Sequence, residues 1–250
     1  MLYSKKLIKF KKIKHCFFNK KSGFSKGIYN GLNCGIGSND TKINVNKNLI
    51  KVCRKIKCSK KNLVLLKQIH SNNVHFISKR PKKKLIGDAL VTNKKGVALG
   101  ILTADCAPIF IYDPFNNLIS AIHAGWKGAY KRIISNTLKK LKKKGSKIED
   151  LIAVVGPCIG KNNYEVKKDF VKKFINQDRL NNKFFIYKNN KIFFSLSDYI
   201  RNDLIKMGLE NIEIIKKDTY LNKNNFFSAR RSLKNKFNDY GRNISIIMIK

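Results

Sequence analysis

The sequence predicts an α+β fold, a single-domain layered α/β sandwich around a mixed sheet that takes in residues 1–250. Two observations predict it: short apolar runs typical of strands recur along the chain, and longer stretches carry apolar residues at helical spacing. Strands and helices do not alternate strictly, which argues against a doubly wound parallel sheet. No repeat and no Pro- or Gly-rich linker divides the chain, which contains only 4 prolines.

The predicted strands are short apolar runs bounded by Gly, Pro, Asn or Lys. In chain order they are residues 63–66, 74–77, 97–102, 109–112, 118–122, 152–155, 184–187, 191–194, 212–215 and 244–249. Asn189 and Asn190 separate two aromatic runs, and Asn tolerates the left-handed backbone that a tight hairpin turn requires. The sequence therefore predicts a β-hairpin over residues 184–194.

The predicted helices have apolar residues spaced three and four apart, so that one face is apolar. Their apolar positions are Tyr130, Ile133, Ile134, Thr137, Leu138 and Leu141 in the first, Val166, Phe170, Val171 and Phe174 in the second, and Ile200, Leu204 and Met207 in the third. Gly145 and Gly208 are expected to end the first and third helices, and Ser197 is expected to cap the third at its N-terminus.

The chain is strongly basic, with a formal net charge of +39 and a pI of about 10.2. Lys is scattered along the whole chain, whereas Arg, whose planar fork suits bases and phosphates best, is rare. We therefore interpret the charge as a compositional bias and expect no specific nucleic-acid partner, although a basic nucleic-acid-binding protein stays an alternative. The charge should still attract anionic substrates.

The sequence predicts a cytoplasmic protein without a membrane partner. No apolar run is long enough to cross a bilayer, and residues 1–18 are interrupted by Lys and lack the apolar centre of a secretory signal. Disulfides are therefore not expected among the 6 cysteines. Cys53 and Cys58 have no second cysteine pair nearby, which argues against a zinc ribbon.

Three potential metal ligands each follow or end a predicted strand. His70 comes after strand 63–66, Cys106 after strand 97–102, and His123 directly after strand 118–122. Strand ends meet at the rim of a sheet, so these side chains can converge although they are far apart in sequence. Two imidazoles and a thiolate, with one position left open, form a typical catalytic zinc site. Simple packing of each residue at a strand end stays the other interpretation.

Zinc bound in this way lowers the pKa of its water towards about 7. Asp105, next to the proposed thiolate, is a candidate second-sphere group or proton carrier. Gly125 and Gly128 flank Trp126, where backbone N–H groups could face an anion or the glycines could simply allow the turn. Arg230, Arg231 and Arg242 are candidates for a phosphate contact or for a surface role.

Several motifs together resemble the successive signatures of one bacterial family. It has long been called the multicopper polyphenol oxidoreductase (laccase) family and is now regarded as zinc-dependent purine nucleoside phosphorylases, related to the human FAMIN laccase-domain protein. The motifs are Gln68-Ile69-His70, Gly87-Asp88-Ala89, Thr103-Ala104-Asp105-Cys106-Ala107-Pro108, His123-Ala124-Gly125-Trp126-Lys127-Gly128, Gly156-Pro157-Cys158-Ile159-Gly160, Tyr164-Glu165-Val166, Phe226-Phe227-Ser228, Arg230-Arg231 and Gly241-Arg242. The resemblance extends from about residue 15 to the C-terminus.

The resemblance implies a zinc ion held by His70, Cys106 and His123. It also implies phosphorolysis of adenosine, inosine, guanosine and methylthioadenosine, together with deamination of adenosine. The family's phosphate-binding positions correspond to Lys20, Lys47, Lys127 and Arg230 here. The first three of these are Lys where the family usually has Arg, which keeps the charge but loses the bidentate fork.

True multicopper chemistry is not expected, because the chain has only 4 His and no Met near the motifs. Copper could still replace zinc on the same ligands, since it binds such sites more tightly. The sequence thus predicts a purine nucleoside phosphorylase with adenosine deaminase activity, a cytoplasmic enzyme whose substrates are a nucleoside and phosphate. A cytoplasmic peptidoglycan-precursor editing hydrolase, a role also proposed for members of this family, is the enzymatic alternative.

Overall fold

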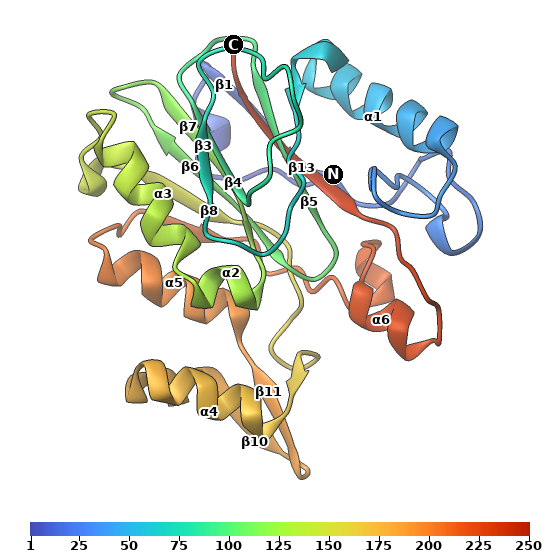
Figure 1. The fold of residues 1–250 in the computed structure, drawn as a ribbon, viewed down its shortest axis with the longest axis vertical. Helices are drawn as coiled ribbons and strands as arrows, with labels where there is room; N and C mark the ends of the chain where they lie inside the picture. Colours follow the sequence, from blue (N-terminus) through green and yellow to red (C-terminus); the bar gives the residue numbers. More distant parts are fainter.

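Two β-sheets pack face to face at the centre of the structure, a computed structural model that describes residues 1–250 (Figure 1). The larger sheet has the order β12-β8-β6-β7-β4-β3 and the other β1-β13-β5-β2, while β10-β11-β9 form a small separate sheet. The strands are β1 (Ile13–Phe17), β2 (Leu63–Val64), β3 (Val74–Phe76), β4 (Ala89–Thr92), β5 (Ala98–Thr103), β6 (Ala107–Asp113), β7 (Leu118–Ala124), β8 (Ile152–Val155), β9 (Glu165–Val166), β10 (Phe185–Lys188), β11 (Lys191–Phe194), β12 (Ile212–Ile214) and β13 (Asn243–Ile249).

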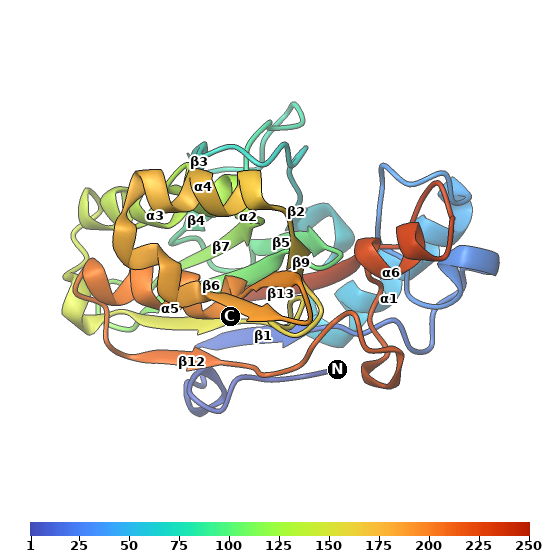
Figure 2. The ribbon, with the colours of Figure 1, turned by 90° about the horizontal axis from the view of Figure 1, so that it is seen from below.

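Helices cover the outer faces of both central sheets. The helices are α1 (Lys42–Ile56), α2 (Trp126–Tyr130), α3 (Ile133–Lys142), α4 (Lys168–Gln177), α5 (Leu196–Lys206) and α6 (Ala229–Lys234). Helices α3 and α5 pack on the larger sheet and α1 on the other, whereas α4 lies beside the β10–β11 hairpin (Figure 1). Helices α3 and α5 lie on one side of the molecule, and α1 and α6 on the other (Figures 1 and 2). None of the helices combines the length and the apolarity needed to cross a bilayer. The α+β class predicted from the sequence is confirmed.

Strand pairing is mixed as predicted, but in two central sheets and not in one. Strand β8 pairs parallel with β12, and β3 pairs parallel with β4, whereas β6 is antiparallel to both of its neighbours. In the other sheet β13 is antiparallel to β1 and β5, and the short β2 is parallel to β5. The hairpin β10–β11 turns at Asn189 and Asn190, whose φ values of 48° and 57° are left-handed as predicted.

Alternation along β7 decides where His123 points. Leu118 and Ile122 face the helix-covered core, whereas Ile119 and Ala121 face the core between the two sheets. Because successive strand residues point to opposite faces, His123 lies on the same face as Ile119 and Ala121. The imidazole is therefore directed towards the space between the sheets, near their edge.

Three details of the predicted helices are wrong. The first predicted helix is divided into α2 and α3, because Arg132 has a left-handed φ of 65°. Val166 lies in β9, and the second predicted helix begins only at Lys168. Helix α5 begins at Leu196 after Ser195, so Ser197 lies inside its first turn and does not cap it. Gly145 and Gly208, with φ of 94° and 86°, follow α3 and α5 as predicted.

The N-terminal part holds elements that were not predicted. Strand β1 lies within the Lys-rich first residues, and Thr41 caps helix α1 by accepting a hydrogen bond from the Asn44 N–H. Helix α1 covers the β1-β13-β5-β2 sheet through a core that includes Val45, Leu49 and Val52. Exposed Lys side chains between the buried positions obscure the periodicity of both elements.

Candidate metal centre

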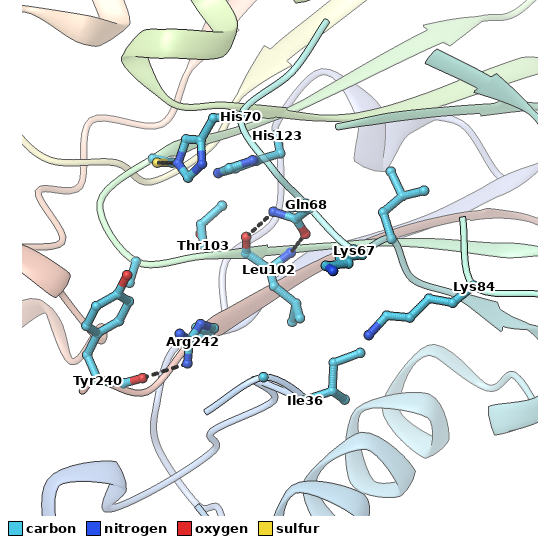
Figure 3. Close-up of a pocket in the computed structure, with 14 residues that line it drawn as sticks. Ile36, Lys67, Gln68, His70, Lys84, Leu102, Thr103, His123, Tyr240 and Arg242 are labelled. Carbon is cyan, nitrogen blue, oxygen red and sulfur yellow. Dashed lines mark hydrogen bonds between the residues drawn. The ribbon is translucent and has the colours of Figure 1, made fainter. Parts of the chain in front are cut away.

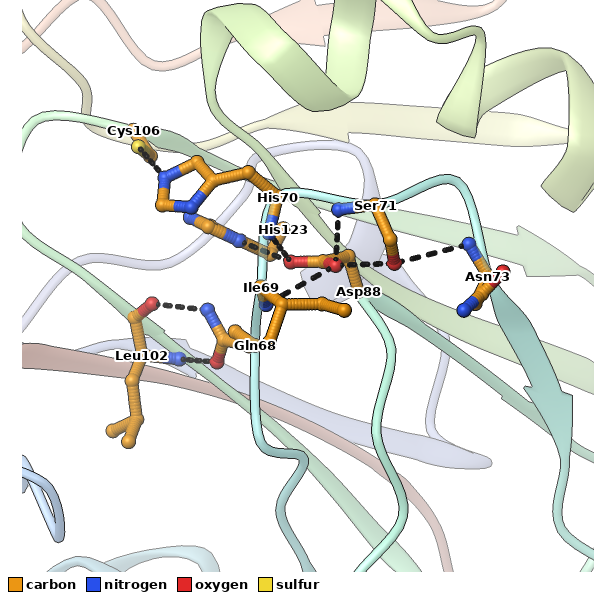
Figure 4. A network of polar contacts seen from close by, with 9 residues as sticks. All are labelled: Gln68, Ile69, His70, Ser71, Asn73, Asp88, Leu102, Cys106 and His123. Carbon is orange, nitrogen blue, oxygen red and sulfur yellow. Dashed lines mark hydrogen bonds and ion pairs between the residues drawn. The ribbon is translucent and has the colours of Figure 1, made fainter.

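His70, Cys106 and His123 converge at one edge of the sandwich, as the sequence predicts. One ligand atom from each lies within 4.8 Å of the other two, and Cys106 Sγ is 3.6 Å from His70 Nε2 (Figure 4). His70 lies in the loop after β2, Cys106 directly precedes β6, and His123 is in β7. His123 is 3% exposed, whereas His70 and Cys106 are partly exposed, which leaves one side of the group open.

Two local devices bring the ligands together. The pairing of β6 with β7 sets Pro108 opposite His123, so Cys106 lies just beyond that pair. The loop that carries His70 is held to β5 by Gln68, whose amide accepts from the Leu102 N–H at 2.9 Å and donates to the Leu102 carbonyl at 2.7 Å. Gln68 thus continues the pairing of β2 with β5 through a side chain.

Asp88 contacts both histidine segments. Its Oδ1 lies 2.7 Å from His123 Nδ1 and accepts from the His70 N–H at 3.0 Å (Figure 4). Its Oδ2 accepts from the Ser71 N–H and hydroxyl, both at 2.6 Å. Since His70 has a left-handed φ of 57°, these bonds stabilise an otherwise unfavourable turn. With Nδ1 of His123 donating to Asp88, Nε2 is the nitrogen free to bind a metal.

Gly125 provides the space in which the ligands meet. A Cβ atom at this position would lie 2.7 Å from Cys106 Sγ and 2.7 Å from His70 Cδ2, closer than side-chain carbons approach. The φ of Gly125 is −75°, so the backbone itself would accept any residue. Glycine is therefore required here by the close approach of the ligands rather than by the turn.

The ligands are also electrostatically coupled. Burial raises the pKa of the Cys106 thiol, but the charge of His123 and hydrogen bonds from His123 and His70 outweigh burial and lower it to about 6. Burial lowers the pKa of His123, but Cys106 and Asp88 outweigh this effect and raise it to about 9. Burial also raises the pKa of Asp88, yet its hydrogen bonds with His123 and Ser71 hold it at about 2. The thiolate form that binds metals is thus favoured.

The donor set fits zinc. Tetrahedral zinc with typical Zn–N and Zn–S bonds sets sulfur and nitrogen about 3.6 Å apart. Cys106 Sγ and His70 Nε2 lie at that separation, 3.6 Å. The free Nε2 of His123 and the room beside Gly125 complete a site with three protein ligands and an open position.

The three candidate ligands line a cavity of about 340 Å³ whose far side is basic. Lys67, Lys84 and Arg242 line it together with His70, Cys106 and His123, and Figure 3 shows the three cations on the side away from the imidazoles. Arg242 also lies 3.5 Å from Asp239, so part of its charge is balanced. The cavity therefore combines a candidate metal site with a region suited to an anion.

A second, smaller cavity of about 160 Å³ adjoins the same cysteine. Its lining residues are Asp105, Cys106, Ile159, Tyr164, Leu196, Ala229, Arg230 and Leu233. Cys106 is the one residue that lines both cavities. The smaller cavity is mainly apolar, with Asp105, Tyr164 and Arg230 as its polar residues besides Cys106.

Asp105 is directed away from the histidines. Its carboxylate accepts hydrogen bonds from Thr219 at 2.7 Å, from Ser228 at 2.9 Å and from the Arg230 N–H at 2.7 Å. Burial raises the pKa of Asp105, and these donors partly offset that effect. Asp105 thus joins the segment before α6 to the Cys106 loop, and a role in proton transfer stays a prediction.

The structure does not gather the predicted phosphate-binding cations at the larger cavity. Lys47 is exposed on α1, and Lys127 lies 5.6 Å from the centre of the Trp126 ring. Lys20 lies over the Phe227 ring, and burial together with the charge of Arg231 lowers its pKa. Arg230 lines the smaller cavity. A phosphate contact stays a prediction for all four.

Asp88, Lys67 and Lys84 were not predicted as functional residues. Asp88 stands in the Gly87-Asp88-Ala89 motif, which contributed to the family resemblance but for which no function in the site was predicted. Lys67 immediately precedes the Gln68-Ile69-His70 motif, and Lys84 belongs to a run of Lys that resembles the rest of this basic chain. Lys67 and Lys84 could not be distinguished from the many other Lys residues of the chain, whereas Arg242 was singled out because Arg is scarce.

Comparisons with known proteins agree with this fold. The chain is 35% identical over 196 residues to a purine nucleoside phosphorylase of Rickettsia conorii, covering 78% of this chain and 79% of that protein. It is 31% identical over 245 residues to a purine nucleoside phosphorylase of Bacteroides thetaiotaomicron, covering 92% and 91%. The crystal structure of the hypothetical protein YfiH of Bacillus licheniformis, 28% identical, matches with a TM-score of 0.87 over 95% of this chain and 93% of that one.

The family described as multi-copper polyphenol oxidoreductase laccase matches residues 14–250, which include all three candidate ligands. The relative from Bacteroides thetaiotaomicron and the solved structure from Bacillus licheniformis each match most of the chain. The protein therefore belongs to this laccase-type family, and relatives that match most of its length are named purine nucleoside phosphorylase.

Proposed function

We propose that this protein is a zinc-dependent purine nucleoside phosphorylase that also deaminates adenosine. Adenosine, inosine, guanosine and methylthioadenosine are the proposed nucleosides. Phosphate converts the first three to a free base and ribose 1-phosphate, and methylthioadenosine to adenine and methylthioribose 1-phosphate. The observation that carries the proposal is the group His70, Cys106 and His123 at the wall of a cavity that also contains Lys67, Lys84 and Arg242. The names of relatives that extend over most of the chain support the reaction class.

The protein's own residues would hold the metal and the anion in fixed places. Asp88 orients His123 and the His70 turn, and Gly125 leaves room for the ligand atoms. When bound, zinc supplies a Lewis acid at the reacting centre and activates water for the hydrolytic loss of the 6-amino group of adenosine. Lys67, Lys84 and Arg242 would balance the charge of phosphate as it attacks C1′ of the ribose.

Inosine incubated with purified protein tests the reaction class. We expect hypoxanthine and ribose 1-phosphate to appear in equal amounts, and only when phosphate is present. Adenosine should give inosine and ammonia without phosphate. If no hypoxanthine appears at any phosphate concentration, the editing hydrolase becomes the better hypothesis.

Metal analysis of two cysteine variants tests the cofactor. Purified protein should hold about one zinc per chain, and Cys106→Ala should lose most of it. Cys58→Ala, which changes a partly exposed cysteine outside the site, is the matched control and should retain the zinc. Full zinc retention in Cys106→Ala would contradict the assignment of the site.

A further inference from the structure

The two cavities that are both lined by Cys106 differ in chemical character. The larger one, about 340 Å³, contains three cationic side chains besides the metal ligands. The smaller one, about 160 Å³, is walled mainly by Ile159, Leu196, Ala229 and Leu233. An anion is favoured in the first because its charge is balanced there, and a flat apolar ring is favoured in the second.

Tyr164 gives the smaller cavity a hydrogen-bonding group. Its ring is fixed by edge contacts with Phe170 and Phe194, whose centroids lie 6.4 Å and 5.9 Å away. The Arg230 guanidinium lies 5.5 Å from the ring centroid and donates to the Glu165 carbonyl at 2.8 Å. Tyr164 lines this cavity, and no hydrogen bond within the protein engages its hydroxyl.

The other polar groups of this cavity are already engaged. The Asp105 carboxylate accepts from Thr219, from Ser228 and from the Arg230 N–H. One guanidinium with a carbonyl partner is a weak site for a phosphate dianion compared with the three cations of the larger cavity. The smaller cavity is therefore better suited to a neutral heterocycle than to phosphate.

We propose that the smaller cavity binds the purine base of the nucleoside and that the Tyr164 hydroxyl is the hydrogen-bonding partner of this base. The inference rests on the proposed phosphorolysis and concerns the position of the nucleoside in that reaction only. A nucleoside with its base in the smaller cavity would have its ribose on the side of Cys106, which also lines the cavity that would hold phosphate. The attacking phosphate and the departing base would then occupy different cavities, as displacement at C1′ requires.

The same group accounts for a broad range of bases. A hydroxyl both donates and accepts hydrogen bonds, so it can serve a 6-oxo and a 6-amino purine. A cavity with a single such partner should therefore bind hypoxanthine and adenine with similar affinity. Pyrimidines, which bury less apolar surface, should bind more weakly.

Direct binding of hypoxanthine and of phosphate, measured by calorimetry on the zinc-loaded protein, tests this assignment. Tyr164→Phe removes only the hydroxyl and should weaken hypoxanthine binding roughly tenfold. Ala229→Leu extends a side chain into the cavity and should weaken it at least as much. Phosphate affinity and zinc content should change less than twofold in both variants. Tyr187→Phe, on the exposed hairpin, is the matched control.

The possible outcomes separate the binding site from the reaction. If both variants bind hypoxanthine as wild type does, or if they lose phosphate affinity instead, the assignment is overturned. It is also overturned if wild-type protein binds no purine base. If hypoxanthine binds and depends on Tyr164 while inosine is not phosphorolysed, the base site stands and the proposed reaction fails.

Discussion

Asp88 Oδ1 lies 2.7 Å from Nδ1 of His123, and the same carboxylate accepts from the backbone N–H of His70. One buried side chain thus fixes the ring of one ligand and the turn that carries another. Asp88→Asn offers one oxygen and an NH₂ group that faces donors, so it cannot reproduce both contacts. We expect the variant to bind zinc about 10- to 100-fold more weakly, as measured by competition with a chelator.

Asp113→Asn is the matched control for this measurement. Asp113 is also buried and accepts from the N–H groups of Phe115 and Asn116, at the opposite end of β6 from Cys106. Its replacement should lower stability and leave zinc affinity unchanged. Equal losses of zinc affinity in both variants would mean that Asp88 acts through the fold and not through the ligands.

Gly125→Ala should remove the metal by steric conflict alone. The new Cβ would lie 2.7 Å from Cys106 Sγ, so the sulfur or the His70 ring must shift. We expect a folded protein whose zinc content, measured by elemental analysis, is largely lost. Gly37→Ala is the control, because no atom lies within 4 Å of a Cβ at that position. Normal zinc binding by Gly125→Ala would show that the ligands meet differently.

Part of the site is visible in the sequence because it depends on local patterns. His70, Cys106 and His123 each stand at or near the end of an apolar run, and the ends of such runs meet at a sheet edge. Asp88 is 35 residues from His123, and its role depends on the packing of β4 beside β7. No pattern of neighbouring residues in the sequence predicts the contact between Asp88 and His123.

Prediction of the fold from the sequence is limited in the same way, because local patterns do not reveal contacts between distant segments. The apolar spacing from residue 130 to residue 141 continues unchanged across Arg132, because a single left-handed residue alters direction without altering composition. Helix α1 and strand β1 were concealed by exposed Lys residues, which lower the local apolarity without preventing burial of one face. Apolar periodicity therefore predicts whether a segment is a helix or a strand. The point at which a helix is interrupted and the elements that pack against it depend on tertiary contacts.

Zinc affinity should depend on pH in two steps. His123, with its pKa raised to about 9, must lose a proton before its Nε2 binds the metal, so affinity should fall about tenfold per pH unit from pH 9 to pH 6. Below the Cys106 pKa of about 6 a second proton competes, and the fall should become steeper. Isothermal titrations in buffers of different ionisation enthalpy would count the protons released. Release of no proton at pH 7 would contradict the raised pKa of His123.

Nucleic-acid binding should be weak and without sequence preference. The net charge of +39 comes from Lys spread along the whole chain, so the attraction is to phosphates and depends on counterion release. Filter binding with unrelated duplexes should give similar affinities that fall steeply as salt rises. A nanomolar complex with one sequence at physiological salt would favour the alternative of a nucleic-acid-binding protein.

Phosphate should be recognised by the cations of the larger cavity. Lys84→Ala and Arg242→Ala each remove one of the three positive charges there, so each should raise the KM for phosphate several-fold in inosine phosphorolysis. Adenosine deamination needs no phosphate and should stay within a few fold of wild type. Lys82→Ala, two residues from Lys84 and exposed, is the matched control for the loss of a Lys from this basic loop.

His123→Ala and Lys127→Ala complete this test. His123 is a proposed ligand of the metal that both reactions would share, so its loss should abolish phosphorolysis and deamination. Retained phosphorolysis would mean that the metal is structural. Lys127 lies against Trp126 outside the larger cavity, yet the sequence resemblance predicts a phosphate contact for it. If Lys127→Ala raises the KM for phosphate while Lys84→Ala and Arg242→Ala do not, the anion binds on the Trp126 side of the metal. In that case the basic cavity must serve the ribose or the base instead.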